Sequence, residues 1–304
     1  MKTIEKITNE FLTKARPKLK ESTYSGYSFI CERHIIPYFK GTDISQLNND
    51  TIRDFVLYKM KNGGLDGTAL SPKTINDMLC LLAQIIRSHI QFDLDIEKPQ
   101  YIQEEINVLT EIDYNKLKTY LAIGTDSKKL GIIIVLLTGL RLGELCSLKW
   151  SDIDLEKGTI SINKTIQRIK STDQYSTSKT KIVIDTPKSK ASVRTIPIPL
   201  ILLSKLGNFK SSDNSYILTN TNKHIEPRVY QRHFKSYLKE CGIREYNFHV
   251  LRHTFATMAI SKEMDIKTLS MLLGHTDVGF TMKRYIHPNI EHRRLQIEKI
   301  AVGF

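Results

Sequence analysis

Arginine, histidine and tyrosine side chains that could hold and attack a phosphate group recur in short segments of the second half of the sequence. Arg141 follows Gly139, a residue that should end the apolar helix before it and place the arginine at a sharp backbone turn. His249 and Arg252 are three residues apart, so they would share one face of a helix. Two guanidinium groups offer permanently charged, planar forks that fit phosphate oxygens. These residue types favour phosphoryl-transfer chemistry.

A second glycine and a tyrosine extend the set. Gly274 should stop a helix with His275 just beyond it, and Tyr285 stands ten residues later. A tyrosine hydroxyl, with an ordinary pKa of about 10, becomes a nucleophile when nearby cations or a histidine base help to remove its proton. Any one of the 13 tyrosines is more often a packing residue, and Arg141 beside Glu144 is more often a salt bridge. Only the whole set, in its order, is evidence for phosphoryl-transfer chemistry.

A metal site is the alternative interpretation of the histidines. His249 and His253 are four residues apart, the spacing of some zinc ligands. The glutamate that metalloproteases place after the first histidine is missing, and no third ligand is evident. We therefore expect no metal. Four widely spaced cysteines form no Cys-x-x-Cys pair and are expected to be free, mostly buried thiols: Cys31, Cys80, Cys146 and Cys241.

The order Arg, His-x-x-Arg, Gly-His, Tyr resembles that of the tyrosine recombinase, or phage integrase, family across essentially the whole second domain. The resemblance implies that the scissile phosphate of DNA is held by Arg141, His249, Arg252 and His275 and attacked by Tyr285. It implies a covalent 3′-phosphotyrosyl intermediate that conserves the bond energy, and strand exchange through a Holliday junction. It also implies that no metal, ATP or other cofactor is needed.

The family also uses a lysine on a hairpin and an acidic residue after its first arginine. Lys188 and Lys190 compete for the lysine's role, and Lys188 is preferred because it lies at the strand-side position. Glu144 matches the acidic residue and would orient Arg141. In this scheme His249 is the base for the tyrosine hydroxyl, and a Lys188 of lowered pKa protonates the leaving 5′ oxygen.

The charge distribution predicts a polyanionic partner, double-stranded DNA. The net charge is +13, and residues 1–100 hold 14 Lys and Arg against 12 Asp and Glu, so most of the excess lies in the remainder. Each phosphate that such a protein neutralises releases counterions. The residues expected to contact DNA are Lys18, Lys20, Lys73 and Arg87 in the first part of the chain, and Lys190 and Arg194 in the second.

Hydrophobic periodicity in residues 1–98 predicts a compact unit of four helices. The first contains Ile4 and Ile7 and should close at Pro17. The expected N-caps of the other three are Ser22, for a helix through Phe39, then Asn49 or Asp50, and finally Ser71 before Pro72. The third helix should end at residues 62–64 and turn four apolar side chains inward, Ile52, Phe55, Val56 and Met60. The fourth should do the same with Met78, Leu81, Leu82, Ile85 and Ile86.

Residues 99–108 are expected to be a linker, and residues 109–304 a second domain. Thr110 should cap its first helix, and residues 129–137 and 142–148 form the next two. Alternating patterns at 159–169, 181–186 and 192–198 predict a small antiparallel sheet within this helical domain. The predicted fold is mainly α with a small sheet. The resemblance adds that the first unit is a SAM-like core-binding domain that clamps DNA together with a mixed α/β catalytic domain.

The ends of the chain bear on assembly. Residues 289–300 carry Ile290, Leu295 and Ile297 as a short amphipathic helix, which would pack either in cis or on a neighbouring subunit. The resemblance implies a monomer in solution, a homotetramer on synapsed DNA, and a possible directionality factor. Residues 1–14 leave no room for an additional arm-binding domain, so the minimal two-domain form is expected.

Several alternatives stay open at this point. The long polar segment 169–181 favours the integrase of a mobile element over a chromosome-dimer resolvase. A type IB topoisomerase and a non-catalytic DNA-binding protein are the other rivals. A metal-dependent nuclease would need clustered carboxylates, and the only tight pair, Asp152 and Asp154, is expected to cap a turn after Trp150. Lacking a signal sequence or a membrane-length apolar run, the chain is expected in the cytoplasm.

Overall fold

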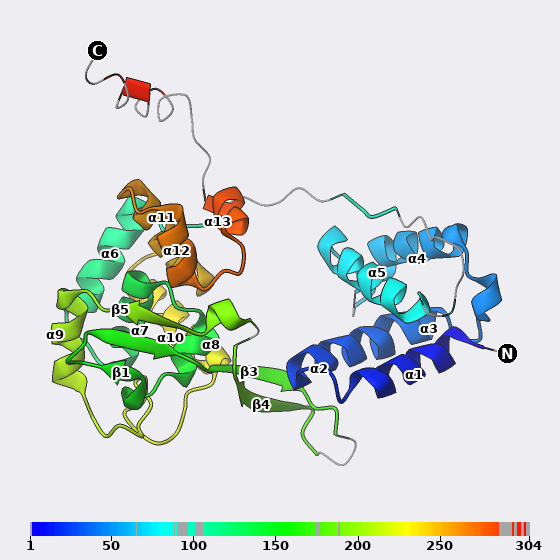
Figure 1. Cartoon of the computed structure of the whole chain (residues 1–304), viewed down its shortest axis with the longest axis horizontal. Helices are drawn as coiled ribbons and strands as arrows, with labels where there is room; N and C mark the ends of the chain where they lie inside the picture. Colours follow the sequence, from blue (N-terminus) through cyan, green and yellow to red (C-terminus); the bar gives the residue numbers. More distant parts are fainter. Residues whose placement is uncertain are drawn as a thin grey trace. The chain divides into compact units, whose positions relative to one another are not determined.

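The computed structural model describes residues 2–64, 66–87, 89, 97–100, 106–173, 177–187, 189–285, 294, 297–298 and 301. The chain divides into two compact units (Figure 1). The first comprises Met1–Glu104 together with Ile169–Lys181, and the second comprises Glu105–Arg168 and Ile182–Phe304. The linear division at 99–108 therefore misses one feature, because a segment from the middle of the sequence groups with the first unit.

The first unit is helical. Its elements are α1 (Ile4–Ala15), α2 (Glu21–Ile30), the π-helical segment η1 (Cys31–Ile35), α3 (Ile36–Tyr38), the 3-10 turn η2 (Ile44–Gln46), α4 (Asn49–Asn62) and α5 (Pro72–Ile86). Because α2, η1 and α3 follow one another without a break, they correspond to the single helix that the sequence predicts up to Phe39. The four predicted helices are thus confirmed.

The helix starts differ from prediction at two of three positions. Ser71 caps α5 as expected, accepting a hydrogen bond from the amide of Thr74. Asn48, rather than Asn49 or Asp50, caps α4 through the amide of Thr51. The second helix begins at Glu21, one residue before the predicted cap Ser22. At α4 neighbouring polar residues compete for the cap, and Asn48, which has extended backbone angles, takes it; at α2 the N-cap is Lys20, whose side chain makes no capping hydrogen bond.

The buried face of α4 contains one unexpected residue. Ile52, Phe55 and Val56 are buried as predicted, but Met60 is 41% exposed and Lys59 is only 5% exposed. Positions 52, 55, 56 and 59 follow the i, i+3, i+4, i+7 spacing of a single helix face, and position 60 lies at its edge. The prediction for Met60 is wrong because geometry, not residue type, decides which position faces the interior.

A tight apolar core holds the first unit together. All five predicted residues of α5 are buried, and they pack with Ile4, Ile7, Ile35, Phe39 and Phe55. Fully burying one side chain of this kind contributes roughly 1.5–3 kcal/mol. The segment Ile169–Lys181 joins the unit through polar contacts, with the Ser25 hydroxyl donating to the Lys170 carbonyl at 3.0 Å and the Lys170 ammonium 2.6 Å from a Glu32 carboxylate oxygen.

The second unit combines helices with two small sheets. Its helices are α6 (Glu111–Ala122), α7 (Ser127–Thr138), α8 (Leu142–Ser147), α9 (Leu200–Phe209), α10 (Pro227–Glu240), α11 (His249–Ser261), α12 (Ile266–Leu273) and α13 (Val278–Tyr285), with 3-10 turns η3 (Trp150–Asp152) and η4 (Lys190–Ser192). Its strands are β1 (Ile153–Asp154), β2 (Thr159–Ile162) and β5 (Arg194–Pro197). The residues of β3 (Thr165–Lys170) and β4 (Thr180–Asp185) are divided between the two units. Thr110 caps α6 as predicted.

The predicted single sheet is in fact two. Strands β1, β2 and β5 form an antiparallel sheet in that order, with Ile160 opposite Ile196, while β3 and β4 form a separate two-stranded sheet. The predicted strand 159–169 is therefore broken between Ile162 and Thr165. The Ser147 hydroxyl donates to the Lys164 carbonyl at 3.0 Å, which holds the chain against α8 at this break. Alternation in the sequence does not reveal such a break because it is made by a distant contact.

The core of the second unit surrounds α7. Side chains of α7 such as Leu130 and Ile134 are fully buried, and the single tryptophan, Trp150, is 1% exposed. A smaller cluster of Ala256, Ala259, Leu269 and Leu273 lies between α11 and α12, and Tyr285 packs against it. All four cysteines are free, with Cys31 and Cys146 buried and Cys80 exposed. Within the described parts of the chain, no helix has both the length and the apolar character that a membrane span requires.

Candidate active site

Two glycines end the helices that lead into the site. Gly139 (φ +68°) follows α7, and Gly274 (φ +64°) follows α12, both in the left-handed region that glycine adopts without strain. A Cβ atom on Gly139 would lie 2.5 Å from the Phe255 ring, so side-chain size excludes other residues as well. Both glycine turns lie where the sequence predicts them, before Arg141 and before His275. In addition, the Gly139 carbonyl accepts from Arg252 and the Gly274 carbonyl from Arg141.

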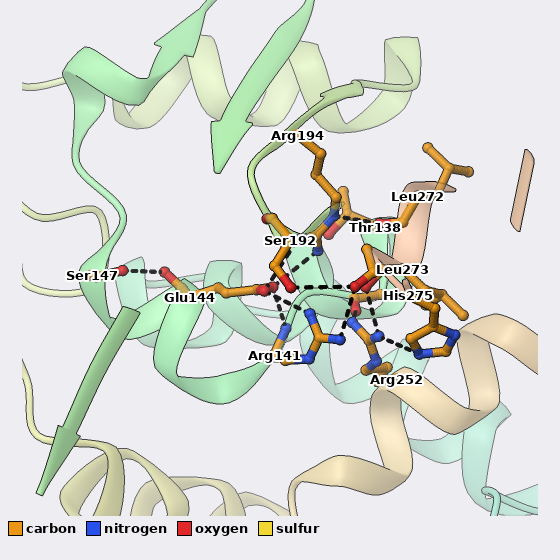
Figure 2. A network of polar contacts seen from close by, with 12 residues as sticks. Thr138, Arg141, Glu144, Ser147, Ser192, Arg194, Arg252, Leu272, Leu273 and His275 are labelled. Atoms are coloured by element: carbon orange, nitrogen blue, oxygen red, sulfur yellow. Dashed lines mark hydrogen bonds and ion pairs between the residues drawn. The ribbon is translucent and has the colours of Figure 1, made fainter. Parts of the chain in front are cut away.

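Arg141 and Glu144 form the first part of a polar network. One guanidinium nitrogen of Arg141 lies 2.9 Å from a Glu144 carboxylate oxygen, and the other donates to the Gly274 carbonyl at 3.3 Å (Figure 2). The other carboxylate oxygen accepts the Arg141 amide at 2.9 Å. Glu144 thus holds Arg141 in place, and 34% of the arginine side chain stays exposed.

Arg194 is the second partner of Glu144. Its two terminal nitrogens lie 3.1 and 2.9 Å from the two Glu144 oxygens, and its Nε donates to the Leu272 carbonyl at 2.6 Å (Figure 2). The sequence predicts Arg194 to contact DNA. The structure instead places its side chain, 7% exposed, against the carboxylate, so it is not available as a surface contact in this arrangement. Its role here is to hold Glu144.

Arg252 lies at the centre of the site and is 2% exposed. It donates to the carbonyls of Gly139 and Leu273, each at 2.7 Å, and its NH2 lies 3.0 Å from His275 Nε2. Burial and the charge of Arg141 lower the pKa of Arg252 to about 9, so it stays charged at neutral pH. Backbone carbonyls from two distant helix ends therefore fix a permanent cation in place.

His275 bridges Arg252 and α13. Its Nδ1 lies 2.8 Å from the Thr281 hydroxyl, and its Nε2 faces the Arg252 guanidinium. A guanidinium can only donate, so Nε2 accepts and the proton sits on Nδ1. Burial, followed by the charges of Arg252 and Arg141, lowers the pKa of His275 to about 4. The ring is consequently neutral at physiological pH.

The hydroxyl of Tyr285 is held by a histidine that the sequence analysis did not assign to it. His253 Nδ1 lies 2.7 Å from the Tyr285 hydroxyl. Burial raises the pKa of Tyr285, while the charges of Arg252 and Arg284 act in the opposite direction. The one available signal was the four-residue spacing of His249 and His253, which places both on one helix face but does not reveal a contact 32 residues along the chain.

His249 lies next to His253. The two imidazole rings meet edge to face with centroids 4.8 Å apart. Burial and the charge of Arg252 lower the pKa of His249 to about 4, and burial and the neighbouring His249 lower that of His253 to about 4. Arg284, also absent from the sequence prediction, adds a further positive charge to this group. The site therefore combines fixed cations with neutral imidazoles.

The other predicted residues lie apart from this network or outside the described residues. Lys188 is not among the described residues, and Lys190 is exposed in η4. In the first unit Lys18, Lys73 and Arg87 are exposed, and Lys20 is half-buried at the start of α2. Of the tail segment 289–300, the described residues are too few to test the predicted helix.

The structure also shows where the carboxylates and histidines considered for a metal site lie. Asp152 accepts the Lys149 amide at 3.0 Å and Asp154 accepts the Lys157 amide at 2.8 Å, so both serve turns near Trp150 as predicted. Among the described residues, no three His, Cys, Asp or Glu side chains are grouped in a way that could hold a metal ion.

The arginines, histidines and tyrosine of this site follow one another along the chain in the order that the sequence analysis compared with a protein family. Residues 107–292 match the model of the phage integrase family, and residues 3–60 match the N-terminal SAM-like domain of phage integrases. The first match alone covers more than half of the chain. The chain therefore belongs to the phage integrase family of tyrosine recombinases, and the resemblance drawn from the motifs is confirmed.

Individual relatives refine this assignment. The chain is 30% identical over 203 residues to the XerC-like tyrosine recombinase of Caldanaerobacter subterraneus subsp. tengcongensis, a match covering 61% of this chain and 51% of that protein. It is 23% identical to the ICEBs1 integrase of Bacillus subtilis, over 88% of this chain and 74% of the relative. Among solved structures, the Tn1549 transposon integrase in complex with transposon right end DNA superposes with a TM-score of 0.79 at 21% identity, covering 98% of this chain and 99% of that one. The last match supports the fold.

Proposed function

We propose that the chain is a site-specific DNA recombinase that cleaves and rejoins strands through Tyr285. The observation that carries the proposal is the placement of the Tyr285 hydroxyl, hydrogen-bonded to His253 and within the field of Arg141 and Arg252. Attack of the phenolic oxygen on phosphorus forms a 3′-phosphotyrosyl bond and releases a 5′ hydroxyl. The reverse attack by a 5′ hydroxyl of a partner strand restores the phosphodiester and frees the tyrosine.

The arginines would stabilise the charge that develops on the non-bridging oxygens. Arg252 is held by two carbonyls and Arg141 by Glu144, so neither needs to reorganise when the phosphate arrives. Arg141 keeps 34% of its side chain exposed, and this fits direct contact with a phosphate. His275 Nε2 accepts from Arg252 in this structure, so the ring would donate to a phosphate only after taking up a proton, which the negative charge of the phosphate favours.

His253 is the residue best placed to take the proton of Tyr285. Its Nδ1 lies 2.7 Å from the hydroxyl and its pKa of about 4 keeps it unprotonated at neutral pH. A bound phosphate would raise that pKa through its negative charge, which brings the imidazole closer to the phenol in proton affinity. The sequence prediction gave His249 both this role and a contact with the phosphate, and we propose that His249 keeps only the phosphate contact. Protonation of the 5′ oxygen by Lys188 stays a prediction.

The biological setting is proposed from the relatives and from the hairpin. The match to a Bacillus integrase over 88% of the chain and the polar segment 169–181 support integration and excision of a mobile element. The XerC-like relative supports chromosome-dimer resolution as the second candidate. Recombination between the ends of a circularised element, but not between chromosome-dimer sites, would favour the first. We further propose a homotetramer on synapsed DNA, action in the cytoplasm and a separate directionality factor.

Covalent capture from a library of DNA sequences tests the reaction for any target site. Nicked duplexes with a randomised segment are incubated with the protein, and covalent complexes are isolated under denaturing conditions. Wild type should retain DNA enriched in one sequence, and Tyr285→Phe should retain none. Tyr114→Phe, in the same unit, serves as the matched control and should behave as wild type. Capture by Tyr285→Phe would move the nucleophile elsewhere, and capture without sequence enrichment would favour a topoisomerase.

A further inference from the structure

A polar pocket in the first unit has no part in the reaction described above. It has a volume of about 380 Å³ and lies where α3 and the end of α4 meet. The residues that line it include Arg33, His34, Tyr38, Tyr58, Lys59 and Asn62. Three of these six side chains carry or can carry positive charge, and among the described residues no aspartate or glutamate lines the pocket. Its chemistry is therefore that of an anion site.

Lys59 is buried, and no counter-ion for it is found in the described part of the chain. Its side chain is 5% exposed, and its ammonium lies 5.1, 5.4 and 5.9 Å from the ring centroids of Tyr58, Phe55 and Tyr38. Among the described residues, none forms an ion pair with it. Aromatic faces attract a cation, but they replace only part of the hydration that a buried ammonium loses. Burial accordingly lowers the pKa of Lys59. An incoming anion would supply the missing partner.

His34 supplies a second, independent observation. The ring is 7% exposed, and its Nδ1 has no hydrogen-bond partner in the described part of the chain. Buried polar atoms in folded proteins are almost always paired, so an unpaired one needs an explanation such as an absent ligand. Burial and the charges of Lys59 and Arg33 all lower the pKa of His34, which places the three groups in one electrostatic neighbourhood.

We propose that this pocket binds a phosphate group and that the phosphate belongs to the backbone of DNA held by the first unit. The inference rests on the proposed function for its source of phosphate. Lys59 offers a compact charge at the base, and the exposed Arg33 offers a second at the rim. The pocket is larger than one phosphate group, which leaves space for the flanking sugars against Tyr38 and Tyr58. Such a contact would position the duplex without reading its sequence.

This site differs in kind from the exposed lysines that the sequence predicts as DNA contacts. Lys18 and Lys73 are exposed and contribute charge to a surface. Lys59 is fixed by packing before any ligand arrives, so little conformational freedom is lost on binding. We therefore expect it to contribute more than one exposed lysine does.

The test compares two lysines on the same helix. Lys59→Met and Lys61→Met each remove one charge, but Lys61 is exposed and does not line the pocket. Binding of a fluorescent random-sequence duplex is measured for the full chain carrying Tyr285→Phe, so that cleavage does not interfere. Lys59→Met should lower the affinity by about tenfold and lower the salt-dependence slope by about 1. Lys61→Met should change the affinity by less than Lys59→Met. Equal effects of the two variants would overturn the proposal.

A second variant and a second ligand complete the design. Arg33→Gln, at the rim, does not touch the core and should weaken duplex binding in the same direction as Lys59→Met. Calorimetric titration with inorganic phosphate separates the two sources of the anion. Loss of phosphate binding in Lys59→Met with unchanged duplex binding would overturn the assignment to DNA.

The outcomes also separate this inference from the proposed function. If wild type captures DNA covalently but Lys59→Met binds the duplex normally, the pocket proposal alone fails. If no duplex binds at all, the proposed function fails together with the assignment to DNA. In that case phosphate binding by wild type, lost in Lys59→Met, would still support an anion site.

Discussion

Two buried charges in this molecule have opposite surroundings, because one is paired with opposite charges and the other is not. Glu144 in the second unit is 2% exposed and is surrounded by Arg141, Arg194 and a backbone amide. Lys59 in the first unit is 5% exposed; its ammonium lies near three aromatic rings and forms no ion pair with any described residue. A charge that is fully paired before the ligand arrives serves to orient other groups. A charge that is left unpaired can pair with the ligand itself.

The same contrast extends to the surroundings of each charge. In the second unit, the carbonyls of Gly139, Leu273 and Ser192 and the ring of His275 accept hydrogen bonds from the arginines (Figure 2). In the first unit, the pocket keeps His34 Nδ1 unpaired. Preorganised electrostatics suit a transition state whose charge distribution is fixed by chemistry. An open anion site suits a ligand that must be gripped and released.

The largest effect is expected from the histidine that holds the nucleophile. His253→Gln preserves a hydrogen-bonding side chain but removes the base, so the rate of covalent capture should fall by roughly 10²–10⁴-fold. The pH dependence of the remaining activity should move upward, because the phenol must then ionise without a base. His249→Gln should lower the rate without that change in the profile. A His253→Gln enzyme with the wild-type rate and profile would show that the hydrogen bond has no catalytic role.

Breaking the paired charge should cost stability. Glu144→Ala leaves the buried Arg194 guanidinium without its carboxylate, and removing one partner of a buried ion pair typically costs about 3–5 kcal/mol. Urea unfolding followed by Trp150 fluorescence measures this in the second unit. Lys157→Ala, in the same unit, is the control, because its pair with Asp154 is exposed and should be worth less than about 1 kcal/mol. Equal losses in both variants would contradict the importance assigned to burial.

Acid should destabilise the second unit through its neutral histidines. The pKa values of His249, His253 and His275 are about 4 in the folded chain, against an ordinary value of 6.5. Between these values the unfolded chain binds protons that the folded chain does not, so the free energy of unfolding falls as the pH drops from 6.5 towards 4. Urea unfolding monitored by Trp150 across this range gives the slope. Replacing the three histidines by Gln should flatten it, and an unchanged slope would refute the linkage.

The smallest effect expected is a gain. Lys59→Met replaces an unpaired buried ammonium by an apolar side chain that suits its aromatic surroundings, so the first unit should gain about 1 kcal/mol or more. Thermal unfolding of the full chain, followed by amide hydrogen exchange in α4, would detect it. A stability gain combined with weaker DNA binding would mean that the charge is retained for function. A loss of stability would mean that Lys59 has an internal partner after all.

Much of the architecture follows from local signals. Ser71 before Pro72, Thr110, and the glycines after α7 and α12 mark helix ends through their own backbone preferences, and the helices appear where the apolar periodicity predicts them. The order of the arginines, histidines and tyrosine identifies the family for the same reason, because the motif residues are read directly from the chain.

Only the tertiary structure decided which groups meet. The contacts of Arg252 with Gly139, of Arg194 with Glu144 and of His253 with Tyr285 join residues 113, 50 and 32 positions apart, and no periodicity encodes a partner at such a distance. The burial of Lys59 in place of Met60 has a related cause. A polar side chain is exposed on average, but position 59 lies on the face of α4 that packs against the rest of the unit. The aromatic rings around its ammonium make the burial of Lys59 possible.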